Sequence, residues 1–251
     1  MRTLTNKPSV RRALAVAITL TAPILASAQN VGVSSRTDGS APRPAVDLTP
    51  GTASYKVRLE AGGRIIAMDL TRTVKAQNGA WVVTETNVMP GLTMTDEAVV
   101  DKKTLLLRKR TIHEGPTSAE VQFVGNAATG TITVKGQKRE ISMDVGGGLF
   151  ADGPGGQDAI AALPLANAYT ANFRNFDVES QQVKLRQLRV MGTDTVTVPA
   201  GTFQTWKVLV TSEGGSDEMT AYWVDKASRR VVKMATSLPE QRALATAELV
   251  K

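Results

Sequence analysis

Apolar and polar residues alternate with a period of two along most of the chain from Ala53 onward. Residues 55–60, for example, read Tyr-Lys-Val-Arg-Leu-Glu. In an extended strand successive side chains point to opposite faces, so this pattern buries one face and leaves the other in solvent. Such strands, with few helical segments between them, predict a mainly β fold. We expect a curved antiparallel meander sheet, or half-barrel, with one or two short helices.

Turn residues divide this pattern into hairpins. Asn78-Gly79 gives the strongest signal, because both residues accept the positive φ of a tight hairpin turn. Pro199-Ala200-Gly201 is typical of a hairpin corner with a bulge, because proline presets φ and glycine accepts positive φ. Further hairpins are predicted within residues 99–112, near Gly136, at Gly192, at Gly214-Gly215 and within residues 223–234.

Two segments have helical features. Residues 156–166 could form about two turns, with Asp158 in the first turn and Pro164 ending the helix. The C-terminal residues 237–251 allow a helix that begins at Pro239. They equally allow a last strand that pairs with residues 229–235, and we favour the strand.

Two parts of the chain resemble each other at a nearly constant offset. Trp81 corresponds to Trp206 and Asp101 to Asp225, and in each part a Trp-led strand precedes a strand ending in Val-Asp-Lys. Either meanders simply resemble one another, or an ancient duplication produced two similar half-sheets around one core. Tryptophan side chains that face the same way would support the duplication.

The ends of the chain predict an exported protein. Residues 1–28 have a basic start, a short apolar run and an Ala-Ser-Ala end, which is typical of a cleavable signal peptide. Residues 29–52 are rich in Ser, Gly and Pro and are interpreted as a flexible linker. We expect residues 53–251 to form a single folded domain. We expect a periplasmic location, with an extracellular one as the alternative, and no membrane-spanning segment in the mature chain.

Composition narrows the classes of function. The net charge of +7 falls to +3 when the four basic residues of 1–28 are removed, leaving 26 basic against 23 acidic residues. A nucleic-acid-binding protein carries a larger and more clustered excess, so no nucleic-acid partner is expected. The chain has no cysteine, which excludes a lipid-anchoring cysteine, disulfides and thiolate chemistry.

No catalytic or metal-binding arrangement is recognisable. His113 is the sole histidine, and no G-x-S-x-G motif accompanies it, so a hydrolase would depend on His113 alone. Metal ligands at the required spacing are missing, and the acidic residues around Gly214-Gly215 indicate a solvated turn. Glycine-rich residues 145–157 lack a phosphate-binding pattern. We therefore expect no cofactor, no metal and no enzymatic activity.

Some apolar residues are candidates for a ligand pocket. Leu149 and Phe150 lie inside the glycine-rich segment and could cap a pocket as a lid or anchor the loop on the core. Because Tyr222 and Trp223 are adjacent on one strand, they must face opposite sides of the sheet. The charged run at residues 107–110 is interpreted as blunting a sheet edge or solvating a face. The pocket candidates are Leu149, Phe150, Trp206, Tyr222, Trp223 and Trp81.

The segment "TVTVPAGTFQTWKVLVTSEGG", followed by "YWVDKASRRVVKM", resembles the bacterial exported domain of unknown function 3108 (DUF3108). The resemblance implies a curved antiparallel sheet similar to the half-barrel of the periplasmic lipoprotein carriers (LolA/LolB-like). Those carriers hold acyl chains in the concave face of the sheet. The resemblance supplies no established catalytic residues.

The first hypothesis is therefore a periplasmic, non-enzymatic binding or carrier domain of unknown specificity. Its ligand would be a lipid or another apolar molecule held on the concave sheet face. The alternative is a cell-envelope module that binds another protein, with a filled core. A third hypothesis is a hydrolase with polar residues gathered around His113.

Overall fold

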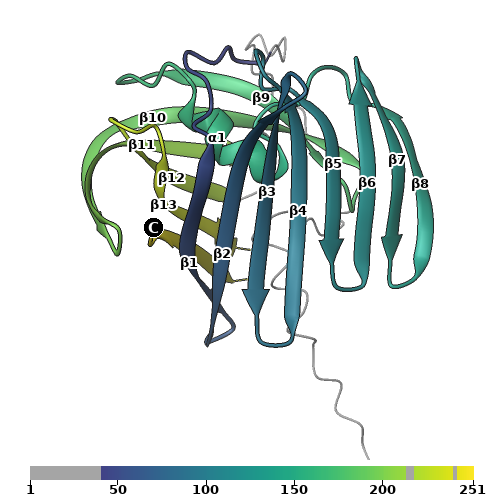
Figure 1. The fold of residues 1–251 in the computed structure, drawn as a ribbon, viewed down its shortest axis with the longest axis horizontal. Helices are drawn as coiled ribbons and strands as arrows, with labels where there is room; N and C mark the ends of the chain where they lie inside the picture. Colours follow the sequence, from purple (N-terminus) through teal and green to yellow (C-terminus); the bar gives the residue numbers. More distant parts are fainter. Residues whose placement is uncertain (1–40, 213–217, 240–241) are drawn as a thin grey trace, which may run out of the picture.

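In the part of the chain that the structure describes, fourteen strands form one antiparallel sheet (Figure 1), which confirms the predicted mainly β meander. The computed structural model describes residues 41–212, 218–239 and 242–251. The predicted signal peptide and residues 29–40 of the predicted linker lie outside these ranges. The elements are β1 (Gly51–Ala61), β2 (Arg64–Gln77), β3 (Ala80–Met89), β4 (Leu92–Asp101), β5 (Leu107–Glu114), β6 (Thr117–Val124), β7 (Ala127–Val134), β8 (Gln137–Asp144), the 3₁₀ turn η3 (Gly153–Gly155), α1 (Gly156–Ala161), β9 (Thr170–Asp177), β10 (Gln182–Val198), β11 (Gly201–Ser212), β12 (Met219–Asp225), β13 (Val231–Leu238) and β14 (Ala243–Leu249).

The sheet joins two half-sheets at its centre, where β1 pairs with β14. The strand order is β8 to β1 and then β14 to β9, so β8 and β9 are the two edges. Figure 1 shows that the sheet is strongly curved: β1–β8 form a front wall, β9–β14 form a back wall, and α1 lies between them. This arrangement is the predicted half-barrel. The α1 helix begins at Gly156 with Asp158 in its first turn, as predicted, but it ends at Ala161, before the predicted end at Pro164.

Most predicted turns are confirmed. Asn78 and Gly79 join β2 to β3 with φ of 50° and 73°, as expected for a tight hairpin turn. Gly136 turns β7 into β8, and Pro199-Ala200 is the corner between β10 and β11. Hairpins also join β4 to β5 and β12 to β13, and the C-terminal segment is strand β14. The turn predicted at Gly214-Gly215 lies outside the described residues, and β11 and β12 pair on either side of it.

The turn predicted at Gly192 is wrong, because β10 continues through this residue as far as Val198. The pairing register shifts between Val190 and Gly192, so the glycine belongs to a β-bulge. A bulge and a turn both use positive φ, and Gly192 has φ of 137°. The extra residue reverses the alternation, so that Val196 and Val198 join a different buried cluster from Val190.

The two similar segments have matching structures, which supports the duplication. Trp81 is buried in the larger cluster of apolar side chains between the walls, which we call the interior cluster, and Trp206 is partly buried against it. The ammonium groups of Lys102 and Lys226 lie 5.2 and 4.4 Å from the respective ring centroids. Corresponding hairpins follow: β4–β5 and β12–β13 each contain a bulge at the equivalent position. The turn of each hairpin begins with an aspartate whose carboxylate accepts backbone N–H groups of that turn. Asp101 accepts from Lys103 and Thr104, and Asp225 accepts from Ser228.

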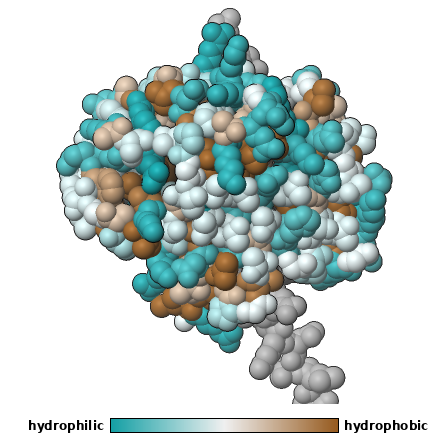
Figure 2. Space-filling model, viewed as in Figure 1, coloured by the Kyte–Doolittle hydropathy of each residue, from teal (hydrophilic) through white to brown (hydrophobic). Residues whose placement is uncertain are grey.

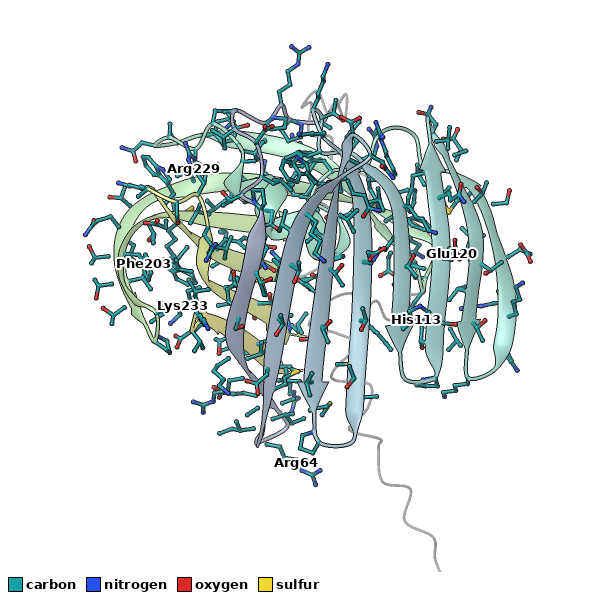
Figure 3. All side chains as sticks on the ribbon, viewed as in Figure 1. Arg64, His113, Glu120, Phe203, Arg229 and Lys233 are labelled. Carbon is teal, nitrogen blue, oxygen red and sulfur yellow. The ribbon has the colours of Figure 1, made fainter. Side chains whose placement is uncertain are left out.

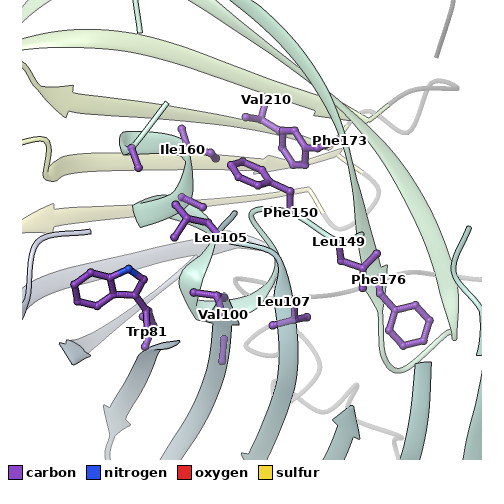
Figure 4. Close-up of a cluster of buried hydrophobic side chains, with 14 of the residues drawn as sticks. Trp81, Val100, Leu105, Leu107, Leu149, Phe150, Ile160, Phe173, Phe176 and Val210 are labelled. Atoms are coloured by element: carbon purple, nitrogen blue, oxygen red, sulfur yellow. The ribbon is translucent and has the colours of Figure 1, made fainter. Parts of the chain in front are cut away.

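The connection between β8 and β9, residues 145–169, fills the space between the walls, and we call it the insertion. Leu107 N donates to Leu149 O at 3.0 Å, and Phe150 N donates to Arg174 O at 3.0 Å, so the insertion bonds to β5 of the front wall and β9 of the back wall. Leu149 and Phe150 are fully buried in the interior cluster (Figure 4). These two residues therefore anchor the loop on the core, and they do not cap an open pocket as a lid.

Candidate functional site

Six charged side chains form two ion-pair clusters between the front wall and the insertion, one around Arg72 and one around Arg110. Five of them are buried, and the sixth, in the first turn of α1, is partly buried. We call them the buried charge network: Arg72, Glu85, Asp96, Arg110, Asp152 and Asp158.

Arg110 on β5 is the centre of one half of the network. Its Nη2 donates to Asp96 Oδ2 on β4 at 2.7 Å, and its Nη1 donates to Asp152 Oδ1 of the insertion at 3.4 Å. Asp152 Oδ2 also accepts the Phe176 N–H of β9 at 2.5 Å, so this carboxylate connects both walls. The 107–110 run was interpreted as solvated, which is wrong for Arg110. In the β4–β5 pairing Val99 pairs with Lys109 and Val100 with Leu107, so Arg108 is the extra residue of a bulge. This bulge turns the Arg110 side chain inward.

Arg72 on β2 is the centre of the other half. It lies directly opposite Glu85 of β3 in the ladder and donates a hydrogen bond to its carboxylate. Its Nη1 also donates to Asp158 Oδ2 of α1 at 3.2 Å. With the Gln157 amide in the orientation that satisfies its hydrogen bonds, the amide oxygen accepts from Arg72 Nε at 2.8 Å.

The glycines of the insertion allow this close packing. A Cβ at Gly153 would lie 2.9 Å from Arg110 Nε, and φ at this residue is +59°. A Cβ at Gly156 would lie 2.7 Å from the Ala151 carbonyl oxygen. Both positions therefore require glycine so that the insertion can approach the guanidinium group and begin α1.

A cavity of about 130 Å³ lies beside the network, between the two walls and α1. Its front side is formed by Arg72, Glu85 and the insertion, and its back side by strands β9 to β13. Charged and hydroxyl groups predominate among the side chains around it. The polar lining residues are Arg72, Glu85, Asp152, Gln157, Asn175, Asp177, Lys184, Arg186, Glu218, Thr220, Tyr222 and Thr236.

The back side of the cavity is held by Arg186 of β10. Its Nε donates to Asn175 Oδ1 at 3.2 Å, and its Nη2 donates to the Glu218 carboxylate at 3.1 and 3.2 Å. Asn175 Nδ2 in turn donates to the carbonyl oxygens of Phe150 and Ala151, both at 3.0 Å. Burial raises the pKa of Tyr222 to about 12, so its hydroxyl remains protonated at neutral pH.

The residues predicted to line a pocket are mostly core residues. Trp81, Leu149 and Phe150 are buried in the interior cluster, and Trp206 is partly buried against it. Trp223 is partly buried in the second cluster, where its Nε1 donates to Asp194 Oδ2 at 3.1 Å. Tyr222, whose side chain lies on the opposite face of β12 from Trp223, lines the cavity. The structure thus brings Tyr222 to the cavity and leaves the other five candidates in the packing around it.

Sequence reasoning did not find the buried charge network, although a signal was present. Arg72 stands between Leu70 and Val74, and Asp96 stands between Met94 and Ala98, in the phase of the strand that is otherwise apolar and buried. A charged residue in the buried phase of a strand needs a partner inside the protein. Alternation along the strand identifies such charged residues in the sequence. Their partners cannot be identified in the same way, because they depend on which strands pair and in which register.

His113 lies on β5, where its side chain is exposed (Figure 3). It does not line the interior cavity. Among residues 41–212, 218–239 and 242–251, no three or more His, Asp or Glu side chains are grouped to hold a metal ion.

Glu114 provides a prediction about pH. Burial raises the pKa of Glu114 to about 7; the charge of Asp96 adds to this effect and Arg110 opposes it. The folded protein therefore binds a proton that the unfolded chain releases above its usual pKa of about 4.3. Stability must then fall as the pH rises from about 4.3 to 7, by at most about 3–4 kcal/mol from this group. Because Glu114 is only partly buried, solvent screening reduces the expected effect to about 2 kcal/mol. We expect Glu114→Gln to match the unsubstituted protein at pH 4 and to be about 2 kcal/mol more stable at pH 8. Urea unfolding at both pH values tests this expectation, and equal stabilities at pH 8 would contradict it.

The curved sheet, with a polar cavity between its two walls, defines a half-barrel protein. The sequence matches the family model described as "Protein of unknown function (DUF3108)" over residues 52–245, more than three quarters of the chain. The chain therefore belongs to this family, which confirms the resemblance of residues 195–215 and 222–234. A comparison with curated proteins gives no match.

Solved structures with some similarity come from three bacteria. A protein with a YmcC-like fold from Bacteroides fragilis NCTC 9343 is 10% identical with a TM-score of 0.33, covering 82% of this chain and 98% of its own. The hypothetical lipoprotein YmcC from Escherichia coli K12 is 10% identical with a TM-score of 0.33, covering 79% and 84%. A DUF1329 family protein from Desulfovibrio piger is 10% identical with a TM-score of 0.26, covering 84% and 85%.

Proposed function

We propose that this chain is an exported, non-enzymatic binding or carrier domain of the periplasm, whose ligand occupies the interior cavity. The observation that supports the proposal is the cavity itself. It lies between the two walls and is lined by charged side chains that the surrounding strands and the insertion hold in fixed positions. Buried polar groups in a concave site are the usual means of orienting a ligand.

Export is supported by the pattern of residues 1–28, with its basic start, apolar run and Ala-Ser-Ala end. Within the part of the chain that the structure describes, no helix is long and apolar enough to cross a membrane. The outer surface of the front wall is mainly polar or neutral, with small scattered apolar areas (Figure 2).

The size and lining of the cavity favour a small polar ligand over the lipid or other apolar ligand expected from the sequence. A volume of about 130 Å³ is well below the ~300–1,000 Å³ of pockets for drug-sized ligands. An apolar cavity of roughly 150 Å³ holds a molecule of the size of benzene. An acyl chain would also have to displace Leu149 and Phe150, which occupy the apolar part of the interior.

The proposal that the domain is not an enzyme is supported by the state of its polar groups. The charged side chains of the buried charge network are paired with one another, and His113 is exposed away from the cavity. General acid–base or nucleophilic catalysis needs a titratable group within hydrogen-bond reach of a bound substrate, oriented by a second group.

Native mass spectrometry of the mature protein, purified from periplasm without denaturation, tests the proposal. We expect a stoichiometric adduct of a small polar molecule. Thr236→Met, which fills the cavity from β13, should abolish the adduct, whereas Thr246→Met at the partly exposed Thr246 of β14 should retain it. An adduct that survives Thr236→Met would contradict a site in the cavity. An adduct with the mass of a lipid would instead support the apolar ligand.

The second candidate function is a protein-interaction module whose partner would be a cell-envelope protein. It is favoured by the packing of the insertion, which fills much of the interior, and by the edge strand β8. In the described ranges β8 pairs with β7 alone, and an edge strand can accept a strand from another chain. A crosslinked partner recovered through residues 137–144, together with a ligand-free cavity, would favour this function.

A further inference from the structure

We propose that the cavity takes a small organic cation, carrying a primary ammonium or a guanidinium group. This inference rests on the proposed function, because it concerns the ligand of the same cavity. It follows from the hydrogen-bonding state and the formal charge of the lining side chains.

The arginines that line the cavity are already engaged by acceptors of the protein. Arg72 donates to Glu85, to Asp158 and, in the satisfied amide orientation, to Gln157. Arg186 donates through its Nε, Nη1 and Nη2 atoms to three partners, of which Glu218 takes two bonds. The third basic lining residue, Lys184, is paired with Asp177 at 3.3 Å. An anionic ligand would have to compete with these acceptors, so the geometry disfavours a carboxylate or phosphate.

Acceptors remain on both sides of the cavity. Glu85, whose side chain is 8% exposed, takes its hydrogen bond from Arg72 through Oε1. A carboxylate offers about four lone-pair positions, so Glu85 can accept further N–H groups. On the opposite side, Thr236 is buried and its hydroxyl lies 3.1 Å from that of Thr220. These hydroxyls can also accept hydrogen bonds from an ammonium group.

The charge of the site points the same way. The charged residues that line the cavity are three basic and four acidic, which gives a formal charge of −1: Arg72, Lys184 and Arg186 against Glu85, Asp152, Asp177 and Glu218. Adding the two charged groups that pair with them from outside the lining, Arg110 and Asp158, leaves this charge unchanged. Excess charge away from water is costly unless it is paired, and a bound cation supplies the missing partner.

Three probes of similar shape and different charge test the inference: n-butylammonium, n-butanol and n-butanoate. Their dissociation constants for the mature protein are measured by calorimetry at pH 7.5 and constant ionic strength. We expect n-butylammonium to bind at least tenfold more tightly than the other two. Butanoate binding as tightly as butylammonium, or no binding of any probe, would overturn the inference.

Two variants locate the binding site. Glu85→Gln keeps an acceptor for Arg72 but removes the negative charge, and should weaken n-butylammonium binding at least tenfold. Thr236→Val leaves every ion pair intact and should weaken binding several-fold, so the test does not depend on the folding of the first variant. Thr71→Val, on the exposed face of β2 beside Arg72, is the control and should leave binding unchanged. Equal affinities for all the variants would exclude the cavity as the cation site.

The outcome also separates this inference from the proposed function. A small neutral or anionic adduct in native mass spectrometry, with no preference for n-butylammonium, would overturn the cation and leave a binding domain. A ligand-free extract together with no probe binding would count against both.

Discussion

Arg110→Ala should lower the free energy of unfolding by about 3–5 kcal/mol, because it leaves two buried carboxylates without their cation. The Arg110 and Asp96 side chains are each 1% exposed and are joined at 2.7 Å, and Asp152 depends on the same guanidinium. The loss would be a large part of the ~5–15 kcal/mol that stabilises a typical domain. Urea unfolding of the mature protein at pH 7 measures it.

Arg108→Ala is the matched control for this prediction. Arg108 lies two residues earlier on β5, and its ion pair with Asp101 is half exposed, so its loss should cost less than about 1 kcal/mol. If Arg110→Ala were no more destabilising than Arg108→Ala, the network would not connect the front wall to the insertion as described.

Phe150→Ala should cost about 3–5 kcal/mol, the usual effect of removing a fully buried aromatic side chain. Phe150 packs edge-to-face on Phe173 with ring centroids 5.7 Å apart, and its backbone N–H bonds to Arg174 of β9. The cavity left behind would loosen the contact between the insertion and the back wall. Urea unfolding gives the magnitude, and hydrogen exchange at residues 145–165 shows whether the loosening is local.

Phe203→Ala is the comparison for this second prediction. Phe203 is partly exposed near the β10–β11 corner, so its removal should cost less than the removal of Phe150. The reverse order would mean that the insertion contributes little to stability. It would then behave as the mobile lid that its six glycines also allowed.

Local signals in the sequence were sufficient for most of the sheet. Asn78-Gly79 and Gly136 determine hairpins through their own backbone preferences, and alternation identifies the buried face of β1 without knowledge of its neighbours. Gly192 was misread because a glycine with positive φ fits a bulge as well as a turn. The choice between them depends on the pairing of β10 with β11, which is not a local property.

The candidate site could be predicted only in part. Tyr222 and Trp223 were both candidates because adjacent strand residues face opposite sides, and the sequence could not tell which of the two lines the cavity, where Tyr222 lies. Arg110 was missed because the bulge at Arg108 moves the Arg110 side chain to the other face of the sheet. Nothing near Arg108 in the sequence marks that bulge. Asp152 contacts Arg110 because the insertion, residues 145–169, packs back against the front wall. Their contact follows from the fold and not from a motif.

The central claim is that a small polar ligand occupies the cavity between the two walls. A crystal structure of the mature protein, purified natively from periplasm, tests it most directly. The account predicts density for a small molecule in contact with Glu85 and Thr236, with Leu149 and Phe150 still packed in the core. Density for an acyl chain between the walls, with the insertion displaced, would contradict it, as would a cavity that contains only water.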